Sequence, residues 1–348
     1  MRSPTLLLTL AAAAALASTS ADAQQGPDTT WVPTVPRPAY AGNGPRVGID
    51  EAHLNFHTAT GNYRPFAALL RADGYRVSAS TARFTRESLA AFDVLVVANA
   101  RGGTGLDAFS NPAFTAEECT AVREWVRAGG SLLLIADHAP FGTAAEPLSL
   151  RFGVDMSKGW AFDTARGTAA EENRSFLRYD RENGLLGSHP ILQGRDGAER
   201  VSKVVAFTGQ SLSIPAGADV LLRLSPTAQD RQPPTREELQ AQAASRQRMV
   251  DSVVAALRAR GGADSTAVRL NPMQDNSPQR FAPAAGRAQG LALTVGSGRV
   301  VILGEAAMLS AQVVNLPGRE PMRMGMNVPG HDDQQFALNV LHWLSRLY

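Results

Sequence analysis

Short apolar runs alternate with helical patterns from residue 46 to residue 136. Strands are expected at 46–50, 75–78, 93–98 and 131–136, and helices at 63–72, at a short segment ending at 92, and at 115–128. The runs DVLVVA and SLLLIA are apolar without alternation, which is typical of strands covered on both faces. The pattern predicts an α/β fold with an open, mostly parallel, flavodoxin-like sheet and helices on both of its faces.

The second half of the chain is less regular. Residues 153–226 are rich in loops and β-like segments, and a hairpin is expected to join 290–295 to 299–304. A closing helix with an apolar stripe is expected at 333–347. Residues 227–286 turn toward Gln, Arg, Ala and Pro around one capped helical pattern, so we expect them to form a helical surface insertion.

The N-terminal residues have two compositions. Residues 1–23 combine a basic start at Arg2, a short apolar run and a small-residue cleavage site, which is typical of a signal peptide. Residues 24–45 are rich in Pro, Gly and Thr and are expected to form an extended linker. The remainder, 46–348, is expected to be one domain. We therefore expect an exported protein, either periplasmic or secreted after the signal peptide is removed.

Composition excludes several classes of function. The 348 residues include 34 Lys and Arg against 32 Asp and Glu, and this balance gives no support to nucleic-acid binding, which needs a concentrated basic surface. No stretch after the signal is long and apolar enough to span a membrane. The one cysteine, Cys119, excludes an internal disulfide and any multi-cysteine zinc or iron–sulfur site. The sequence leaves the oligomeric state open.

Ionisable side chains gather directly after the predicted strands. In an open parallel sheet, ligands bind in the crevice outside the carboxyl ends of the strands. Half of the six histidines lie in these strand exits, so we expect the exits to line one crevice. The first exit holds Asp50, Glu51, His53, Asn55 and His57, the second holds Arg101, the third holds Asp137 and His138, and the last holds Glu305.

This set of side chains has three possible uses. Imidazoles and carboxylates are ligands of zinc, manganese and iron, and His53 and His57 have the i, i+4 spacing of two ligands on one helical turn. Carboxylate–histidine pairs also act as general acid and base in hydrolysis. Asp, Asn and His can instead hold sugar hydroxyls without any reaction. Structural roles are alternatives, such as Asp50 capping a turn, His57 packing in the core or Asp137 bonding to loop backbone.

Known catalytic motifs and stacking residues are scarce. The chain contains no GxSxG elbow and no GxxxxGK[ST] loop, and no GxGxxG follows the first strand, so serine-hydrolase and nucleotide-binding functions have no support. Phe56 and Phe141 are the only rings in the strand exits, which is a thin supply for stacking on sugars. Four late methionines can line a groove, although filling the core is their default role: Met308, Met322, Met324 and Met326.

Several segments carry a family resemblance. DEAHLNFH after the first strand, GGSLLLIADH, the HPI turn, GEAAMLSAQ and FALNVLHWL are similar to the class I glutamine-amidotransferase-like superfamily. They more closely resemble its exported branch, which is related to the sugar-binding-like domain of intraflagellar-transport proteins. The similarity covers about 46–225 and 287–348 and implies the fold more than an activity.

One departure from the superfamily bears on function. True glutamine amidotransferases carry a nucleophilic cysteine in a GxCxGxQ elbow after the strand that corresponds to SLLLIA. Here that position holds Asp137 and His138, and Cys119 lies on the helix before the strand. We therefore expect no glutaminase activity.

Two hypotheses of different class remain. The first is a metal-assisted hydrolase of envelope or carbohydrate substrates. Its metal-binding or polarising groups would be His53, His57, Asp137 and His138, and its general base would be Glu51 or Glu305. The second is a non-catalytic domain that binds a small molecule, a glycan or a protein in the same crevice. The thin supply of aromatic side chains favours the hydrolase.

Overall fold

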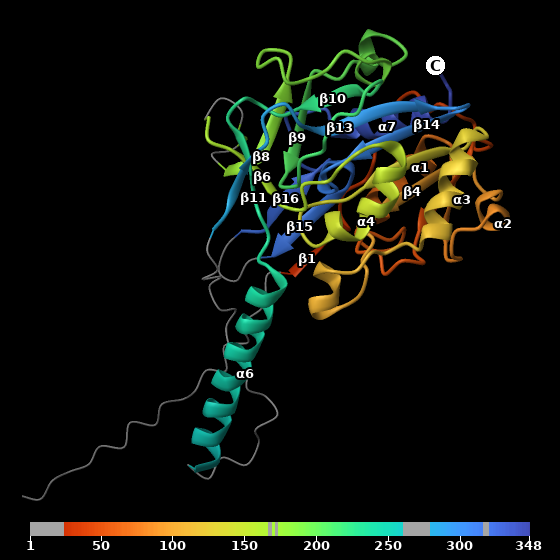
Figure 1. Cartoon of the computed structure of the whole chain (residues 1–348). Helices are drawn as coiled ribbons and strands as arrows, with labels where there is room; N and C mark the ends of the chain where they lie inside the picture. The colour runs from red at the N-terminus through yellow and green to blue at the C-terminus, as the bar shows by residue number, and fades with distance from the viewer. Residues whose placement is uncertain (1–23, 166–168, 171–172, 260–278, 316–319) are drawn as a thin grey trace, which may run out of the picture.

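The computed structural model describes residues 24–165, 169–170, 173–259, 279–315 and 320–348. The predicted signal peptide, 1–23, lies outside the described residues. Figure 1 shows a layered body from which one long helix, α6 (Arg236–Ala259), stands away. No helix among the described residues combines the length and the apolar character needed to cross a membrane.

A seven-stranded sheet forms the centre of the body. Its strand order is β10-β13-β14-β5-β4-β2-β3. The five strands from β14 to β3 are parallel to their neighbours, whereas β13 is antiparallel to both β14 and β10. The bounds are β2 (Arg46–Asp50), β3 (Arg76–Ser80), β4 (Val94–Ala98), β5 (Ser131–Ile135), β10 (Asp219–Arg223), β13 (Ala288–Val295) and β14 (Gly298–Leu303).

Helices cover both faces of this sheet because successive strand side chains point to opposite sides. In β4, Val94 and Val96 pack with α1 (Arg64–Ala72) and α7 (Asp333–Leu344), near which α5 (Pro190–Gln193) also packs. Leu95 and Val97 pack on the other face with α2 (Arg86–Leu89), α3 (Ala116–Arg127) and α4 (Phe141–Ser149). All five β4 side chains are buried, and each large one stabilises the fold by about 1.5–3 kcal/mol.

Three small sheets extend the body. Their orders are β1-β15-β16, β12-β11-β6 and β7-β8-β9. The bounds are β1 (Gln24–Pro27), β6 (Trp160–Asp163), β7 (Ala169–Ala170), β8 (Asn173–Asp180), β9 (Lys203–Phe207), β11 (Ala228–Arg231), β12 (Phe281–Pro283), β15 (Ala311–Asn315) and β16 (Met322–Gly325). Short 3-10 helices are η1 (Gly105–Phe109), η2 (Leu150–Phe152), η3 (Gly197–Glu199) and η4 (Ala307–Leu309).

The fold is therefore mixed α/β, and the flavodoxin-like sheet expected from the sequence is found only in part. The predicted strands over 46–50, 93–98 and 131–136 are present as β2, β4 and β5. The predicted hairpin is β13–β14, and it supplies the antiparallel strand that makes the sheet mixed. The capping box expected in the third helix is formed by Thr115 and Glu118.

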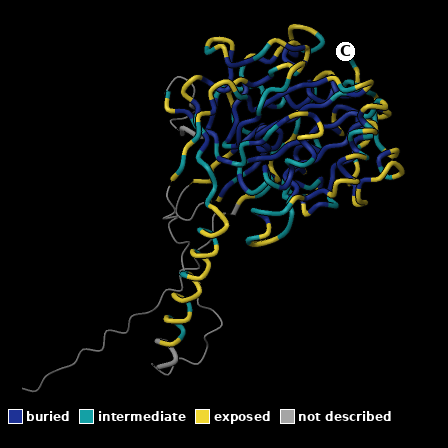
Figure 2. The backbone as a smooth tube through the Cα atoms, in the orientation of Figure 1, coloured by how far each residue is buried: buried dark blue, intermediate teal, exposed yellow. Residues whose placement is uncertain are grey.

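Two segments differ from their expected organisation. Residues 24–45 are not a free linker, because β1 pairs with β15 and the rings of Trp31 and Tyr40 pack against the core. The ends of 227–286 belong to the body, since β11 pairs with both β6 and β12. Of the described part of that insertion, α6 is largely exposed, while the body is mostly buried (Figure 2).

Candidate functional site

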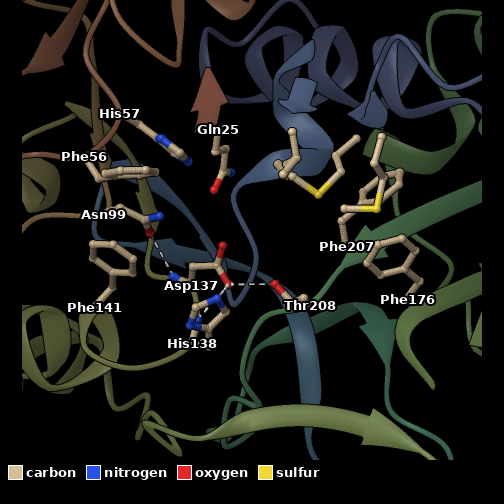
Figure 3. A pocket seen from close by; sticks show the side chains of 14 residues that line it. Gln25, Phe56, His57, Asn99, Asp137, His138, Phe141, Phe176, Phe207 and Thr208 are labelled. Carbon is tan, nitrogen blue, oxygen red and sulfur yellow. Dashed lines mark hydrogen bonds and ion pairs between the residues drawn. The ribbon is translucent and has the colours of Figure 1, made fainter. Parts of the chain in front are cut away.

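A pocket of about 430 Å³ opens at the carboxyl ends of the parallel strands, where the sequence predicts the crevice. Figure 3 shows polar side chains at its floor between two pairs of phenylalanines. The polar lining residues are Gln25, His57, Asn99, Asp137, His138 and Thr208, and the apolar ones are Phe56, Phe141, Phe176, Phe207, Ala307, Val314, Met322 and Met324.

Asp137 is the centre of the floor. It follows β5, and its backbone N–H donates to Asn99 Oδ1 at 2.9 Å. Its Oδ1 accepts from the backbone N–H of His138 at 2.7 Å and from the Thr208 hydroxyl at 3.5 Å. These contacts bring the exits of β4, β5 and β9 to one point.

Two of these partners have unusual backbone geometry. Asn99 has φ +50°, and Thr208 has φ +104°, which is costly for a β-branched residue. Gly209 follows with φ +105°, and a Cβ there would lie 2.5 Å from the Gly304 carbonyl oxygen. The close approach of β9 to β14 thus sets the turn that aims the Thr208 hydroxyl at Asp137. Such strain, about 1–3 kcal/mol per residue, is concentrated at functional sites.

The carboxyl groups of Asp137 and Glu305 are weaker acids than they would be in water. Burial raises the pKa of Asp137, and the nearby His138 and the hydrogen bonds to it only partly oppose this. Behind it, burial and the charge of Asp137 raise the pKa of Glu305 well above its usual range. Glu305 follows β14 by two residues, and its two oxygens accept from the backbone N–H groups of Ala307 and Met308 at 2.7 and 2.8 Å. Glu305 therefore supports the floor from below and does not line the pocket.

His138 is the most accessible ionisable group of the pocket, with 30% of its side chain exposed. Its Nδ1 lies 2.8 Å from the carbonyl oxygen of Ala139, which can only accept, so Nδ1 carries a hydrogen. The other nitrogen, Nε2, lies 3.9 Å from Asp137 Oδ1. The ring stacks on Trp160 at 5.4 Å between centroids. His138 therefore presents Nε2 as its free position.

His57 lines the pocket as a neutral imidazole. Burial lowers its pKa to about 3, and its Nδ1 has no hydrogen-bond partner among the described residues. The ring stacks on Tyr63 with centroids 4.5 Å apart, and the Tyr63 hydroxyl donates to the carbonyl oxygen of Ala306. Because protonation is disfavoured, His57 can offer a ligand one donor or one acceptor but no charge.

Two pairs of phenylalanines form the walls. Phe56 and Phe141 lie 5.9 Å apart between ring centroids, and Phe176 and Phe207 lie 5.1 Å apart on the other side (Figure 3). Phe176 and Phe207 come from β8 and β9, which are not among the strand exits expected from the sequence. The stacking supply is therefore larger than the sequence predicted.

The methionines divide between the core and the pocket. Met308 and Met326 belong to the main core cluster. Met322 and Met324, from β16, line the pocket. Met324 also belongs to a small core cluster with Phe176 and Phe207, so the core role expected by default is wrong only for the exposed Met322.

His53 is placed elsewhere. Its Nδ1 lies 2.8 Å from Asp50 Oδ2 and its Nε2 lies 2.9 Å from Glu118 Oε1, so both ring nitrogens are occupied. Burial lowers its pKa, but the hydrogen bonds and charges of the two carboxylates outweigh burial and raise it. Asn55 completes this cluster by donating to Asp50 Oδ2 at 3.0 Å. The group fixes the β2 exit to the start of α3.

Glu51 and Arg101 also lie outside the pocket lining. Glu51 accepts from the backbone N–H of Ala59 at 2.9 Å, and Arg101 Nε donates to the carbonyl oxygen of Leu54 at 2.8 Å. Both therefore order the loop after β2. Of the expected site residues, the structure brings His57, Asp137 and His138 into the pocket and places Asp50, Glu51, His53, Asn55, Arg101 and Glu305 around it.

The expected metal centre does not form. Residues 51–57 are irregular, so the i, i+4 spacing of His53 and His57 does not bring their rings to one helical turn. Within the described ranges, no three side chains of His, Cys, Asp or Glu converge as metal ligands. The donor set of these described residues therefore does not fit a zinc, manganese or iron ion.

The only cysteine is remote from the pocket. Cys119 is buried on α3 in the core between that helix and the sheet, and burial raises the pKa of its thiol. The position after β5, where the amidotransferase nucleophile would stand, holds Asp137 and His138.

Comparisons with known proteins support the fold. No family model matches the chain, and no curated protein matches it. The N-terminal domain of mmIFT52 superposes with a TM-score of 0.53 at 12% identity, covering 86% of this chain and 97% of that domain. A ThuA-like protein from Bacteroides uniformis (TM-score 0.40, 10% identity, 90% and 94% coverage) and a GMP synthase protein from Thermoplasma acidophilum (0.37, 8%, 87% and 94%) are also among the matches. At these identities the likeness shows the fold alone.

Proposed function

We propose that this protein binds a small organic molecule in the pocket at the carboxyl ends of β4, β5 and β9. One observation carries the proposal: a polar floor centred on Asp137 lies between two walls of phenylalanine in a pocket of about 430 Å³. Pockets of this size and makeup are typical of small-molecule sites, in which a few polar groups orient a largely apolar ligand. The sequence-based preference for a metal-assisted hydrolase loses its support, because within the described ranges the metal ligands do not converge.

A ligand screen on the mature chain, residues 24–348, tests this function. Compounds that bind only the folded state raise the melting temperature, and titration calorimetry then gives the affinity. Phe56→Ala and Phe141→Ala should each weaken binding by about tenfold or more, since each removes an aromatic wall worth at least about 1.4 kcal/mol. Phe281→Ala is the matched control, because this phenylalanine is 50% exposed and outside the pocket. Equal losses in all three variants would contradict the assignment.

Metal-free hydrolysis is a second candidate, and the geometry of His138 favours it. Its Nδ1 hydrogen is held by the Ala139 carbonyl oxygen, so Nε2 is free to accept a proton in the pocket beside Asp137. The raised pKa of Asp137 gives the opposite role, a carboxyl group that can donate a proton. Envelope fragments and carbohydrates are the substrates to examine first.

Mass spectrometry of the ligand after incubation separates the two candidates. An enzyme releases product with the wild-type chain, while His138→Ala binds the same compound and leaves it intact. A binding domain returns the compound unchanged from both proteins. The lack of a cysteine in the pocket lining supports the expectation that glutamine is not hydrolysed.

We also propose that the protein is exported. The proposal is supported by the signal-peptide pattern of residues 1–23, which combines the basic Arg2, a short apolar run and a cleavage site of small residues. N-terminal sequencing of protein recovered outside the cytoplasm should begin at Gln24. A chain that retains Met1 in the cytoplasm would contradict the proposal.

A further inference from the structure

The floor of the pocket holds carboxyl groups without a lysine or an arginine among the lining residues. Asp137 lines the pocket and Glu305 supports its floor. Among the described residues, Asp137 forms an ion pair only with His138. Glu305 accepts hydrogen bonds from two backbone N–H groups and has no ion pair in the described part of the chain. A buried carboxyl group without a cationic partner is costly in its ionised form.

The walls suit a positive charge. Ring faces of phenylalanine attract cations, and two pairs of rings, Phe56–Phe141 and Phe176–Phe207, face the floor from opposite sides (Figure 3). Met322 and Met324 add polarisable sulfur to the same walls. An organic cation placed between them has aromatic rings on two sides and the Asp137 carboxyl group at the floor.

The polar groups of the pocket are poorly suited to a ligand with many hydroxyls. The Gln25 amide donates to Gln312, Asn99 Oδ1 accepts from the Asp137 N–H, and the Thr208 hydroxyl donates to Asp137. Each of these three groups therefore has one atom occupied within the protein, which leaves the two imidazoles and the remaining amide atoms for a ligand. A sugar would leave most of its hydroxyls against phenylalanine and methionine, where an unpaired polar group costs free energy.

We propose that the ligand of this pocket is an organic cation, such as an amine or a quaternary ammonium compound, whose positive charge lies against Asp137 and the phenylalanine faces. This inference rests on the proposed binding function and narrows it to one class of ligand. The titratable groups that face Asp137 are His138 from its own loop, His57 from the β2 exit, Tyr63 from the residue before α1 and Glu305 from the β14 exit.

Binding of a cation should change the protonation of the carboxyl groups at the pocket floor. Burial holds the pKa of Asp137 and of Glu305 above their usual values, and an approaching cation opposes this by favouring their ionised forms. A neutral ligand does not favour the ionised forms. Cation binding should therefore release protons in the pH range of the raised pKa values, and it should tighten as the pH rises through that range.

Titration calorimetry with matched pairs of compounds tests the inference. The probes are choline and benzyltrimethylammonium, each compared with the neutral analogue in which a tert-butyl group replaces the trimethylammonium group. The cation should bind about 10- to 30-fold more tightly than its analogue, mainly through attraction to the Asp137 carboxylate and to a smaller extent through the phenylalanine rings. Repeating the titration in two buffers of different ionisation enthalpy counts the protons released.

Two pocket variants test where the positive charge of the ligand lies. Asp137→Asn should remove most of the preference for the cation while the neutral analogue binds as before. Phe141→Leu should reduce the preference a few-fold and keep the apolar contact. Circular dichroism confirms that each variant is folded, and Phe281→Leu is the control outside the pocket.

The outcomes separate this inference from the binding function. Equal affinity for cation and analogue, or tighter binding of sugars than of either, would overturn the cation assignment and leave the binding function intact. If no cation binds and the wider screen also gives no ligand, both fail. A cation preference that persists in Asp137→Asn would also overturn the inference, because the charge would then lie elsewhere.

Discussion

The carboxyl groups of Asp137 and Glu305 lie at the ends of adjacent parallel strands, β5 and β14, and the pKa of each is raised. Burial is the main cause, and the charge of Asp137 adds to it for Glu305. Two acids in one water-poor place cannot both ionise at low cost. The pair therefore binds protons more strongly than either acid would in water, which links the stability of the fold to the ionisation of the pocket floor.

Glu305→Gln tests this coupling through the pH dependence of stability. A carboxyl group whose folded pKa is raised binds its proton more strongly when folded, so its stabilising contribution is present below the usual value of 4.5 and is lost as the pH rises. The variant lacks this titration. The wild type should thus be most favoured over Glu305→Gln in acid, and the difference in unfolding free energy should shrink toward neutral pH. Urea unfolding at several pH values measures it, and a difference that is constant with pH would contradict the raised pKa.

His53→Ala and His138→Ala should have opposite effects. Removing His53 takes the imidazole away from two buried carboxylates, Asp50 and Glu118, which keep only their remaining hydrogen bonds and the Arg83 ion pair. The unfolding free energy should therefore fall by about 3 kcal/mol while the affinity for a pocket ligand changes little. Removing the partly exposed His138 should weaken binding with a loss of stability below about 1 kcal/mol. Because the pKa of His53 is raised, its contribution to stability is present in acid and is lost as the pH rises through that pKa. Urea titrations and calorimetry on both variants check the contrast; weaker binding in His53→Ala at a temperature where it is folded would argue against our placement of the site.

The position of the pocket could be predicted from the sequence, because the carboxyl ends of parallel strands meet at one edge. The apolar runs identified β2, β4 and β5, and their exits supplied His57, Asp137 and His138. The direction of each exit side chain could not be predicted. Asp50 ends β2, and His53 follows in the same loop as His57. The side chains of Asp50 and His53 nevertheless turn toward α3, because the His53 ring is hydrogen-bonded to the carboxylate of Glu118 in the first turn of that helix.

The second aromatic wall was missed for a topological reason. Phe176 and Phe207 lie on β8 and β9, which pair antiparallel in a small sheet separate from the central one. No periodicity in the sequence indicates where such a sheet packs. The sequence nonetheless contains a signal for this wall: an apolar strand at 203–207 is followed by Thr208-Gly209. Phe207 at the end of that strand and Thr208 after it both line the pocket.

His57 should remain neutral at every pH well above its lowered pKa of about 3. Its pKa, lowered to about 3 by burial, lies below that of an unfolded histidine, so the stabilising effect is present above pH 6.5 and is lost as the pH falls toward the lowered value. NMR of labelled imidazoles should show no titration of His57 between about pH 5 and pH 8, a range in which an exposed histidine titrates fully. His57→Gln, which keeps a polar group without the titration, should lose less stability on acidification than the wild type. A midpoint for His57 near 6.5 would show that its ring is hydrated.

The boundary of the insertion can be tested by deletion. The backbone N–H of Gln232 donates to the Arg280 carbonyl oxygen at 2.7 Å, so the two ends of the insertion leave the body side by side. A two-residue Asn-Gly turn can therefore replace residues 233–279. This shortened chain should melt cooperatively within a few degrees of the full protein, because β11 and β12 are kept. Deleting 227–286 should lower the melting temperature much more, since it removes both strands and the buried side chains of Ala228 and Ala284. Calorimetry of both deletions decides between the two boundaries; equal melting temperatures would mean that β11 and β12 add nothing to the body.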